Sequence, residues 1–588
     1  MFRHSLMVLS VASLLASCAH APAGSSATTE WPSYGKDYSN QRYSPLTQIN
    51  RDNVARLQPA WTFHSGVKAT FQATPIVVGG VMYLSLPFNH VVALDAKTGR
   101  QLWRYEHHLR PDWRLCCGPA NRGVAVSDGK VFVGTADARL IALDAKSGRV
   151  LWDINAVGEN VAQEGVESLS SSDPLSRDKV AGGTGVGIAM APVVYKGMVI
   201  VGITGVGYGL HVESDRPDAP LGAVIGVAGR YGRPGFLAAF DTQTGKRIWQ
   251  FDTIPPEGWE GQFTPTTPDG LTLNRNTANE RATFPQYRDA WRFGGGSAWT
   301  TPSIDPGLGL LYFGTGNPSP QMDDVARPGD NLYTVSLVAL DIASGKLRWH
   351  YQQVPHDMWG YDVASPPVLF DYVLGGRKIP AVGEASKTGW FYVHDRATGE
   401  LLLKSDAFVP QSNLFVHATT DGVRVTPGVF GGANWSPSAV DEGRQQAFVA
   451  AMHMPVRYTL HEVPASADKP AIRYTTSEPI DEPKWGLLSS IDLSTGKIRW
   501  QQKTAEPLVG GVLATAGGLL FTGEGNGHFD AYDTDNGRLL WQYQADAGVN
   551  APPITYQIDG VQYIAVAAGG NQIWGYRKGD GMLVFRLP

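Results

Sequence analysis

Short runs of alternating apolar and polar residues recur along the chain, and several of them share one framework. Each run ends at an Asp, turns through a Gly four residues later, and reaches a Trp eight residues after the Asp. The copies are ALDAKTGRQLW (Asp95), ALDAKSGRVLW (Asp144), AAFDTQTGKRIW (Asp241), ALDIASGKLRW (Asp341), SIDLSTGKIRW (Asp492) and AYDTDNGRLLW (Asp533). A period of two is typical of half-buried strands, and Gly supplies the positive φ of a tight turn. Each copy is therefore predicted to be a β-hairpin.

Two further positions complete the series. The segment VHDRATGELLL keeps Asp395 and Gly399 but has Leu403 where the Trp is expected, and Trp61 in LQPAWTF lacks the turn. An Asp side chain can cap turn amides, and a Trp ring can wedge between neighbouring sheets. Because one sheet cannot bury both faces alone, such copies stack radially and close into a ring. The sequence predicts an all-β, eight-bladed β-propeller with tryptophan docking motifs.

The spacing of the copies indicates where the propeller carries insertions. Asp95 and Asp144 are 49 residues apart, which suits one blade, whereas three later gaps of 97 to 100 residues must hold insertions or degenerate hairpins. Regions 153–190, 204–234 and 252–292 look like insertions and are expected to shape the mouth over a pocket. We expect the C-terminal strand around Tyr563–Val566 to close the ring with N-terminal strands.

The composition agrees with a turn-rich β protein and excludes one class of partner. The chain has 588 residues with 68 Gly and 17 Trp, and only 18% of its residues are charged. A net charge of −5 argues against a nucleic-acid partner, which needs a basic face to meet phosphates.

The N-terminus reads as an export signal. Met-Phe-Arg-His precedes an apolar run from Leu6 to Leu15, which is too short to span a bilayer, and Leu-Ala-Ser-Cys follows. That ending looks like a bacterial lipobox, so residues 1–18 are interpreted as a lipoprotein signal peptide with Cys18 as the lipid anchor. An ordinary signal peptide with a chance Cys is the alternative. Because Ala19 is not the Asp that favours inner-membrane retention, we expect the protein on the periplasmic side of a Gram-negative outer membrane. Residues 19–30 form a flexible tether, and residues 31–588 a single propeller.

Several segments together point to one family. The opening WPSYGKDYSNQRYSPLTQINRDNVARLQPAW, GTGNPSP, SKTGWFYVHDRATG and APPITYQIDGVQYIAVAAGG resemble quinoprotein dehydrogenases that use pyrroloquinoline quinone (PQQ). The resemblance spans roughly residues 31 to 575 and includes the Trp repeat. It implies PQQ as cofactor and a hydroxyl compound as substrate.

The resemblance also implies a cofactor pocket. Cys116 and Cys117 match the adjacent cysteines that form a disulfide against one quinone face, although two buried thiols are the alternative. An oxidising compartment favours the bridge. Arg122 would pair with a cofactor carboxylate, and Gln72 in FQATP stands where the family has a Glu near the pocket.

The opposite side of the pocket is matched as well. Trp299 in GGGSAWTTP matches the Trp that stacks on the other quinone face; a plain inter-blade Trp is its alternative. Lys387 in SKTG resembles a Lys that donates to a quinone carbonyl, and a solvated turn Lys is the alternative. Asn434 and Trp435 in GGANWSP match another cofactor-side segment.

The metal and base positions depart from the family. The family reaction uses a calcium or lanthanide ion and an Asp that removes the hydroxyl proton. Asn317 in GTGN matches one metal ligand, but the Glu ligand position reads Gly207 and the base position reads Gly360. Either another carboxylate reaches in, Asp362 or else Asp357, or the metal is absent. Asp362 shares strand parity with position 360, although an Asp that caps a turn is an equal alternative.

Two functional hypotheses follow. The first is a periplasmic PQQ-dependent oxidoreductase that oxidises an alcohol or sugar-type hydroxyl. Because no CxxCH haem motif is present, its electrons would pass to a separate cytochrome or membrane quinone. The second is a non-catalytic outer-membrane propeller lipoprotein that acts as an assembly or interaction scaffold.

Overall fold

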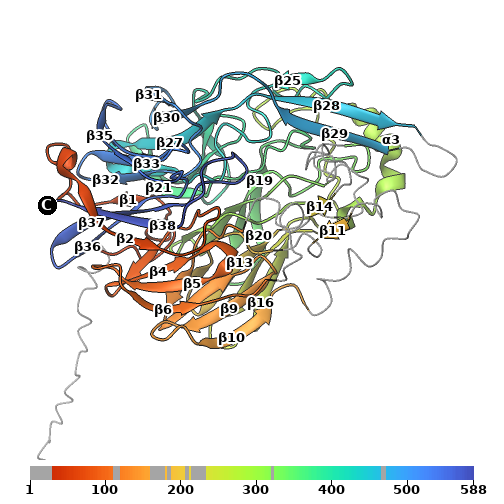
Figure 1. Cartoon of the computed structure of the whole chain (residues 1–588). Coiled ribbons are helices and arrows are strands. Elements are labelled where there is room, and N and C mark those ends of the chain that lie inside the picture. The colour runs from red at the N-terminus through yellow and green to blue at the C-terminus, as the bar shows by residue number, and fades with distance from the viewer. Residues whose placement is uncertain are drawn as a thin grey trace, which may run out of the picture.

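The computed structural model describes residues 29–109, 119–158, 179–181, 187–204, 211–213, 234–293, 295–319, 324–464 and 472–588. Within these residues, eight antiparallel sheets of four strands succeed one another, and one of them gains a short fifth strand (Figure 1). The molecule is thus built almost entirely of β-strands.

The sheets share one strand order, and in five successive pairs of sheets the first strands contact each other. The first strands are β3 (Ile76–Val78), β7 (Ala125–Ser127), β12 (Val193–Tyr195), β17 (Ser303–Asp305), β21 (Val368–Leu374), β26 (Ala439–Asp441), β32 (Leu513–Thr515) and β36 (Ile554–Ile558). The second strands are β4 (Val81–Ser85), β8 (Lys130–Gly134), β13 (Met198–Ile203), β18 (Leu310–Gly314), β22 (Arg377–Ala385), β27 (Gln446–His453), β33 (Leu519–Gly523) and β37 (Val561–Ala568).

In seven of the sheets the third and fourth strands form the hairpins that the repeat predicted; in the last sheet they come from the two ends of the chain. The third strands are β5 (Val91–Asp95), β9 (Arg139–Asp144), β15 (Phe236–Asp241), β19 (Ser336–Asp341), β23 (Phe391–Asp395), β30 (Trp485–Asp492), β34 (His528–Asp533) and β38 (Gly581–Arg586). The fourth strands are β6 (Gln101–Tyr105), β10 (Val150–Asn155), β16 (Arg247–Asp252), β20 (Leu347–Gln352), β24 (Leu401–Lys404), β31 (Ile498–Thr504), β35 (Leu539–Gln544) and β2 (Gln58–His64).

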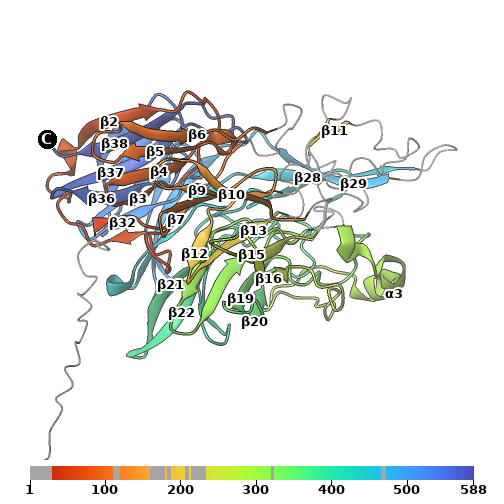
Figure 2. The same ribbon diagram turned by 90° about the horizontal axis from the view of Figure 1, so that it is seen from below.

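The ring closes by joining the two ends of the chain in one sheet. N-terminal β2 pairs with C-terminal β38, and β38 pairs with β37 (Figures 1 and 2). The expected closing segment, Tyr563–Val566, therefore lies one strand further in, within β37. The reason is that β38 follows β37 as one more apolar strand, GMLVFR, and it occupies the position next to β2.

Apolar clusters fill the space between successive sheets. Val91 of β5 and Val131 of β8 belong to one buried cluster, and Leu337 of β19 and Val382 of β22 belong to another. A third cluster joins Phe529 of β34 to strands of the last and first sheets. Burial of such side chains contributes about 1.5–3 kcal/mol each, so every sheet is stabilised by both neighbours.

The repeated tryptophans bridge from one sheet to the next. Trp103 Nε1 donates to the carbonyl of Ala145, directly after the Asp of the next copy, at 2.9 Å. A Cβ on Gly148 of that copy would lie 2.5 Å from the Trp103 ring. Gly is needed there both for its positive φ and because the ring lies on it. Equivalent indole bonds are made by Trp152, Trp249, Trp349, Trp500 and Trp541.

The segment before β2 runs along the first strands and ties them together. Tyr38 O accepts from Ile304 N, Ser39 O from Leu369 N and Gln41 O from Val440 N. The short strand β1 (Tyr43–Ser44) pairs with β32 in parallel. At the start of the segment, the Glu30 carboxylate accepts from the N–H of Gly79, in the turn between β3 and β4.

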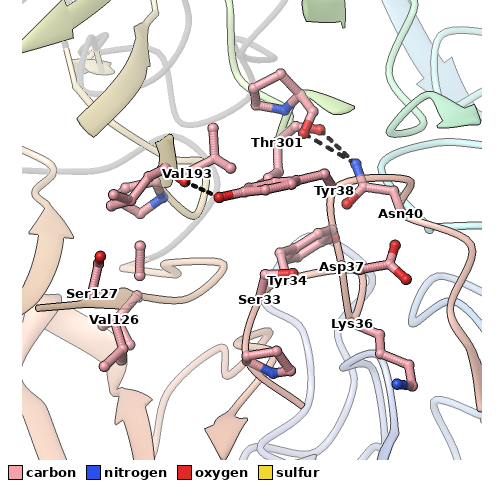
Figure 3. Close-up of a pocket in the computed structure, with 16 residues that line it drawn as sticks. Ser33, Tyr34, Lys36, Asp37, Tyr38, Asn40, Val126, Ser127, Val193 and Thr301 are labelled. Atoms are coloured by element: carbon pink, nitrogen blue, oxygen red, sulfur yellow. Dashed lines mark hydrogen bonds between the residues drawn. The ribbon is translucent and has the colours of Figure 1, made fainter. Parts of the chain in front are cut away.

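A pocket of about 290 Å³ lies between this segment, the first strands β7 and β12, and the residues just before β17 (Figure 3). Its walls come from residues 32–40, 124–127, 192–194 and 301–302. The Tyr38 hydroxyl crosses it and donates to Val194 O at 2.9 Å.

Additional elements extend from the ring. Helix α3 (Thr277–Tyr287) and the hairpin of β28 (Val456–Val463) and β29 (Ile472–Pro479) lie away from the edge that carries the C-terminus (Figures 1 and 2). The small elements are β25 (Val423–Val425) beside β28, the pair β11 (Lys179–Ala181) and β14 (His211–Glu213), η1 (Val54–Arg56), η2 (Pro87–Asn89), η4 (Ala290–Phe293) and η5 (Glu442–Arg444). In the described part of the chain, no helix is long and apolar enough to span a bilayer.

Candidate active site

One position recurs at the entrance to every first strand. The residue four places before the strand is in each case part of a loop that arrives from the preceding sheet. We call these residues the entry ring: Gln72, Asn121, Ala189, Trp299, Ala364, Trp435, Val509 and Asn550. Because the sheets share one strand order, these residues lie at one end of the first strands. The pocket of Figure 3 lies further along the strands from the entry ring.

Arg122 brings two entry-ring tryptophans together. Its guanidinium lies 4.9 Å from the ring centre of Trp299 and 5.3 Å from that of Trp435. Its Nη1 donates to Ala189 O at 3.2 Å, which fixes the head group. Cation–π contacts of this kind favour a planar cation against aromatic faces. The predicted cofactor residues Arg122, Trp299 and Trp435 are therefore neighbours.

Asp362 and Lys387 form a buried ion pair next to Trp299. Lys387 Nζ lies 3.0 Å from Asp362 Oδ1 and donates to the carbonyl of Gly360 at 2.8 Å. Trp299 Nε1 donates to Asp362 Oδ2 at 3.2 Å. The side chains of Lys387 and Asp362 are less than a tenth exposed. The aromatic face, the cation and the carboxylate thus belong to one site.

The two candidate carboxylates have different surroundings. Asp357 is fully buried, and its oxygens accept from the backbone N–H groups of Trp359, Gly360 and Tyr361 at 3.0–3.1 Å. Burial and the nearby Asp362 carboxylate raise the pKa of Asp357 to about 6. Asp357 therefore caps its own loop, and Asp362 is the carboxylate that lies with Lys387 and Trp299.

Gly360, at the vacant base position, is also a structural residue. Its backbone φ is +82°, a value that residues other than Gly rarely adopt. Its N–H binds Asp357 and its carbonyl binds Lys387. The loop thus places the Asp362 pair through backbone atoms of Gly360.

Ion pairs and hydrogen bonds connect the insertion at 252–292 to the loop that contains Asp357 and Gly360. Arg275 pairs with Glu280 of α3 and with Asp330, each at 2.6 Å. Asp330 and Glu280 in turn bind backbone N–H groups of the 261–264 and 329 segments. His356, next to Asp357, lies 2.6 Å from the carbonyl of Gly329 through Nδ1. The insertion is thus connected to the segment that carries Asp362.

A second buried acid lies behind Lys387. Glu384, on β22, is fully buried and accepts from Gln353 Nε2 at 2.8 Å, and Gln353 Oε1 accepts from Ser386. Burial raises the pKa of Glu384 to about 8. Glu384 is therefore largely protonated near neutral pH and supports the turn that carries Lys387.

Donors for a metal ion are few in this region. Asn317 follows β18, and a Cβ on the adjacent Gly316 would lie 3.1 Å from Asp362 Oδ2, so the two loops are close. Both oxygens of Asp362 already accept hydrogen bonds. No group of three His, Cys, Asp or Glu side chains suited to a metal occurs among the described residues. Hard cations prefer several carboxylate oxygens, so the described residues alone do not fit one.

The remaining predicted residues divide into two groups. Gln72 is buried in the entry ring, whereas Asn434 uses its amide locally, with Nδ2 donating to Phe430 O and Oδ1 accepting from Trp435 N. Cys18, Cys116, Cys117 and Gly207 lie outside the described residues. The disulfide and the lipid anchor stay predictions.

Sequence reasoning missed Asn550, the entry-ring residue before β36. A signal for the entry ring exists, because in five of its segments a Pro stands three residues further on: QATP, AMAP, WTTP, ASPP and NAPP. This second repeat would have aligned Asn550 with Gln72 and Trp299.

Comparison with known proteins agrees with this architecture. The family model described as "Glucose/ethanol/alcohol dehydrogenase, beta-propeller domain", of PQQ type, matches residues 31–415 and 404–564. A quinoprotein alcohol dehydrogenase of Pseudomonas putida is 31% identical over 628 residues, covering 99% of this chain and 96% of the relative. A quinoprotein ethanol dehydrogenase of Pseudomonas aeruginosa is 32% identical over 607 residues, covering 94% and 90%.

Solved structures show the same likeness. The quinohemoprotein alcohol dehydrogenase from Comamonas testosteroni superposes with a TM-score of 0.76 at 30% identity, covering 96% of this chain and 81% of that one. A europium-containing methanol dehydrogenase gives a TM-score of 0.74 at 28% identity, covering 95% and 98%. The chain belongs to the β-propeller family of PQQ-dependent glucose, ethanol and alcohol dehydrogenases. As a member of this family, it is an enzyme of the dehydrogenase class.

Proposed function

We propose that this protein is a periplasmic PQQ-dependent oxidoreductase that oxidises an alcohol or sugar-type hydroxyl and passes the electrons to a separate acceptor. The observation that carries the proposal is the contact of Trp299 and Lys387 with one carboxylate, Asp362. A scaffold has no need for a buried ion pair beside an aromatic face, and the relatives give no support to that alternative.

We also infer that the eight sheets are the blades of an eight-bladed propeller and that the repeated tryptophans dock them. The indole hydrogen bonds to the next copy and the apolar clusters between sheets support this. For the lipid anchor and outer-membrane location, the support is the Leu-Ala-Ser-Cys sequence ending at Cys18.

The residues at the entry ring suit a planar cofactor with several negative charges. Trp299 offers an aromatic face, and Arg122 and Lys387 offer cations. Thr300 Oγ1 and Ser436 Oγ, each next to an entry-ring Trp, are buried and have no hydrogen-bond partner among the described residues. Buried polar atoms without partners are unusual in proteins and indicate groups that a ligand would satisfy. PQQ when bound would supply an o-quinone that takes up a hydride from the substrate carbon.

Asp362 is the proposed base in this reaction. It would accept the hydroxyl proton of the substrate. A hydride would leave the carbon that bears this hydroxyl, so that the alcohol becomes a carbonyl compound. Lys387 holds Asp362 and uses two of its three N–H groups on Asp362 and Gly360. Its third N–H is then suited to donate to a quinone oxygen and to stabilise charge that develops there. Arg122 would pair with a cofactor carboxylate.

The proposal is tested by reconstituting the purified protein with PQQ in the presence of EDTA, calcium or a lanthanide salt. We expect a quinone absorbance band that survives gel filtration, followed by its bleaching when a primary alcohol or an aldose is added. Loss of the band on gel filtration under all three conditions would overturn the proposal. A band that survives only with added metal would show that residues outside the described set complete a metal site.

A further inference from the structure

Asn550 is set apart within the described entry ring by a buried side-chain amide whose two polar atoms both lack hydrogen-bond partners. It is fully buried, and among the described residues neither its Oδ1 nor its Nδ2 has a hydrogen-bond partner. Leaving a buried polar group unpaired costs folding free energy. A primary amide with both of its polar atoms unpaired is therefore a place where a ligand would restore lost hydrogen bonds.

Asn121 shows what the same residue does when its role is structural. It occupies the equivalent entry-ring position before β7, and its Nδ2 donates to Gly134 O at 2.8 Å while its Oδ1 accepts from Gly123 N at 2.9 Å. Asn550 stands at the same place in its own sheet without either bond. Position alone therefore does not account for the amide at 550.

Other unpaired donors lie in the same sheet. The loop between β37 and β38 carries Asn571 and Trp574, and Asn571 Nδ2 and Trp574 Nε1 are both buried without a partner among the described residues. Trp574 belongs to a buried cluster with Val509, the neighbouring entry-ring residue, and with Met452 and Met454. This loop therefore reaches the entry ring beside Asn550.

The chemistry of these groups is neutral and directional. Asn550 can donate and accept side by side, and the other two groups donate. The sheet β36–β38 is four sheets away from β17, which carries Trp299, so it lies across the ring from that tryptophan. A ligand with an N–H next to a carboxylate could form two hydrogen bonds with such an amide. Its N–H would donate to the amide oxygen, and its carboxylate would accept from the amide NH₂. The pyrrole N–H of PQQ and the neighbouring carboxylate form an edge of this kind.

We propose that Asn550, with Asn571 and Trp574 beside it, is a neutral recognition subsite for the pyrrole-carboxylate edge of the quinone cofactor. This inference rests on the proposed function. The subsite would fix which way the quinone faces, because Lys387 and Asp362 belong to a different sector of the ring. Asn550 would thus be an orienting residue rather than a catalytic one.

The test compares Asn550→Leu, Asn550→Asp and Asn121→Leu in the full chain. PQQ affinity is measured by titration of tryptophan fluorescence, and thermal unfolding is measured on the cofactor-free protein. We expect Asn550→Leu to weaken PQQ binding about ten- to hundredfold, the range for hydrogen bonds to charged groups, while the unfolding midpoint stays the same or rises. Asn550→Asp should weaken binding further through like charge. Asn121→Leu should lower the midpoint because Gly134 O and Gly123 N lose their partner.

The outcomes separate two kinds of failure. Wild-type protein that binds PQQ, with Asn550→Leu binding equally well, would overturn this inference and leave the proposed function standing. A midpoint of Asn550→Leu that falls as in Asn121→Leu would also overturn it, because the amide would then be structural. Wild-type protein that does not bind PQQ would overturn the proposed function and this inference together.

Discussion

Lys387 and Asp362 are paired at 3.0 Å within a site where Trp299 holds the other carboxylate oxygen. A carboxylate that is anchored at both oxygens keeps a fixed direction. The pair therefore places a carboxylate, the proposed base, beside the aromatic ring of Trp299.

Replacing the proposed base should separate chemistry from binding. We expect Asp362→Asn to lower kcat at least about a hundredfold, since general-base assistance is typically worth 10²–10⁴-fold. The amide keeps an oxygen for Lys387, so PQQ affinity should change little. Steady-state kinetics and a PQQ titration check this, with Asp357→Asn as the control. That control should lower thermal stability, because three backbone N–H groups depend on Asp357. Normal turnover by Asp362→Asn would place the base elsewhere.

Trp299 should be a binding residue rather than an inter-sheet wedge. Trp299→Ala is expected to weaken PQQ binding about tenfold, because a stacked face contributes about 1 kcal/mol beyond its buried area. Trp299→Phe should retain most affinity but lose the hydrogen bond to Asp362. Trp249→Ala offers the contrast, since Trp249 donates to Ile342 O between sheets and its loss should lower the unfolding temperature. If the two alanine variants behave alike, Trp299 is structural.

Restoring the family residue at position 360 should have two opposite effects. Gly360→Asp would add a second carboxylate beside Lys387 and is expected to raise turnover. The φ of +82° should make the variant less stable, by about 1–2 kcal/mol. Turnover and denaturant unfolding measure the two effects independently. A stable variant with no gain in turnover would show that the base position is not limiting.

The buried acid Glu384 should make stability depend on pH. Its pKa is about 8 in the folded protein, against 4.5 for an exposed Glu. The folded state then binds the proton more tightly, so stability falls as pH rises from about 4.5 to 8. Glu384→Gln should raise the unfolding midpoint by about 2 °C at pH 9 and have a much smaller effect at pH 5. Exposed Glu400→Gln is the control. An equal effect of Glu384→Gln at both pH values would contradict the assigned shift.

The predicted lipid anchor can be tested by fractionation. Cys18→Ala should release the protein from the membrane fraction or leave it uncleaved, because an acylated Cys is what holds it. Labelling with a radioactive fatty acid provides the readout. Unchanged membrane association together with unchanged labelling would refute the anchor.

The hairpins of the repeat could be predicted from sequence because each one is determined by residues close together in the chain. Asp95, Gly99 and Trp103 lie within nine residues, and turn geometry and strand alternation act over that range. The fourth strands begin where the repeat predicted, including β2 with Trp61 and β24 with Leu403. The predicted closing strand was wrong because β37 and β38 are both largely apolar, and sequence alone does not decide which one pairs with β2. The β28–β29 hairpin was not foreseen for a similar reason, since it lies inside one of the long gaps.

The site was only partly readable for a different reason. Aromatic and charged residues within recognisable segments identified Trp299, Arg122 and Lys387, which the structure brings together. The separate roles of Asp357 and Asp362 depend on which backbone N–H groups face each carboxylate, and they are determined by the fold of the loop around Gly360. Asn550 was missed because the property that sets it apart, a buried amide without hydrogen-bond partners among the described residues, is visible only in the folded structure.

The hydrogen bond between Glu30 and Gly79 shows at which end of the first strands the N-terminal segment meets the ring. Gly79 is in the turn at one end of β3, whereas Gln72 and the entry ring lie at the other end. The described chain therefore joins the ring from the side opposite the entry ring. If Cys18 carries a lipid and the entry ring holds the cofactor, as proposed, the entry ring would face away from the bilayer. On that proposal, a diffusing cytochrome would reach the reduced cofactor more readily than a quinone confined to the membrane.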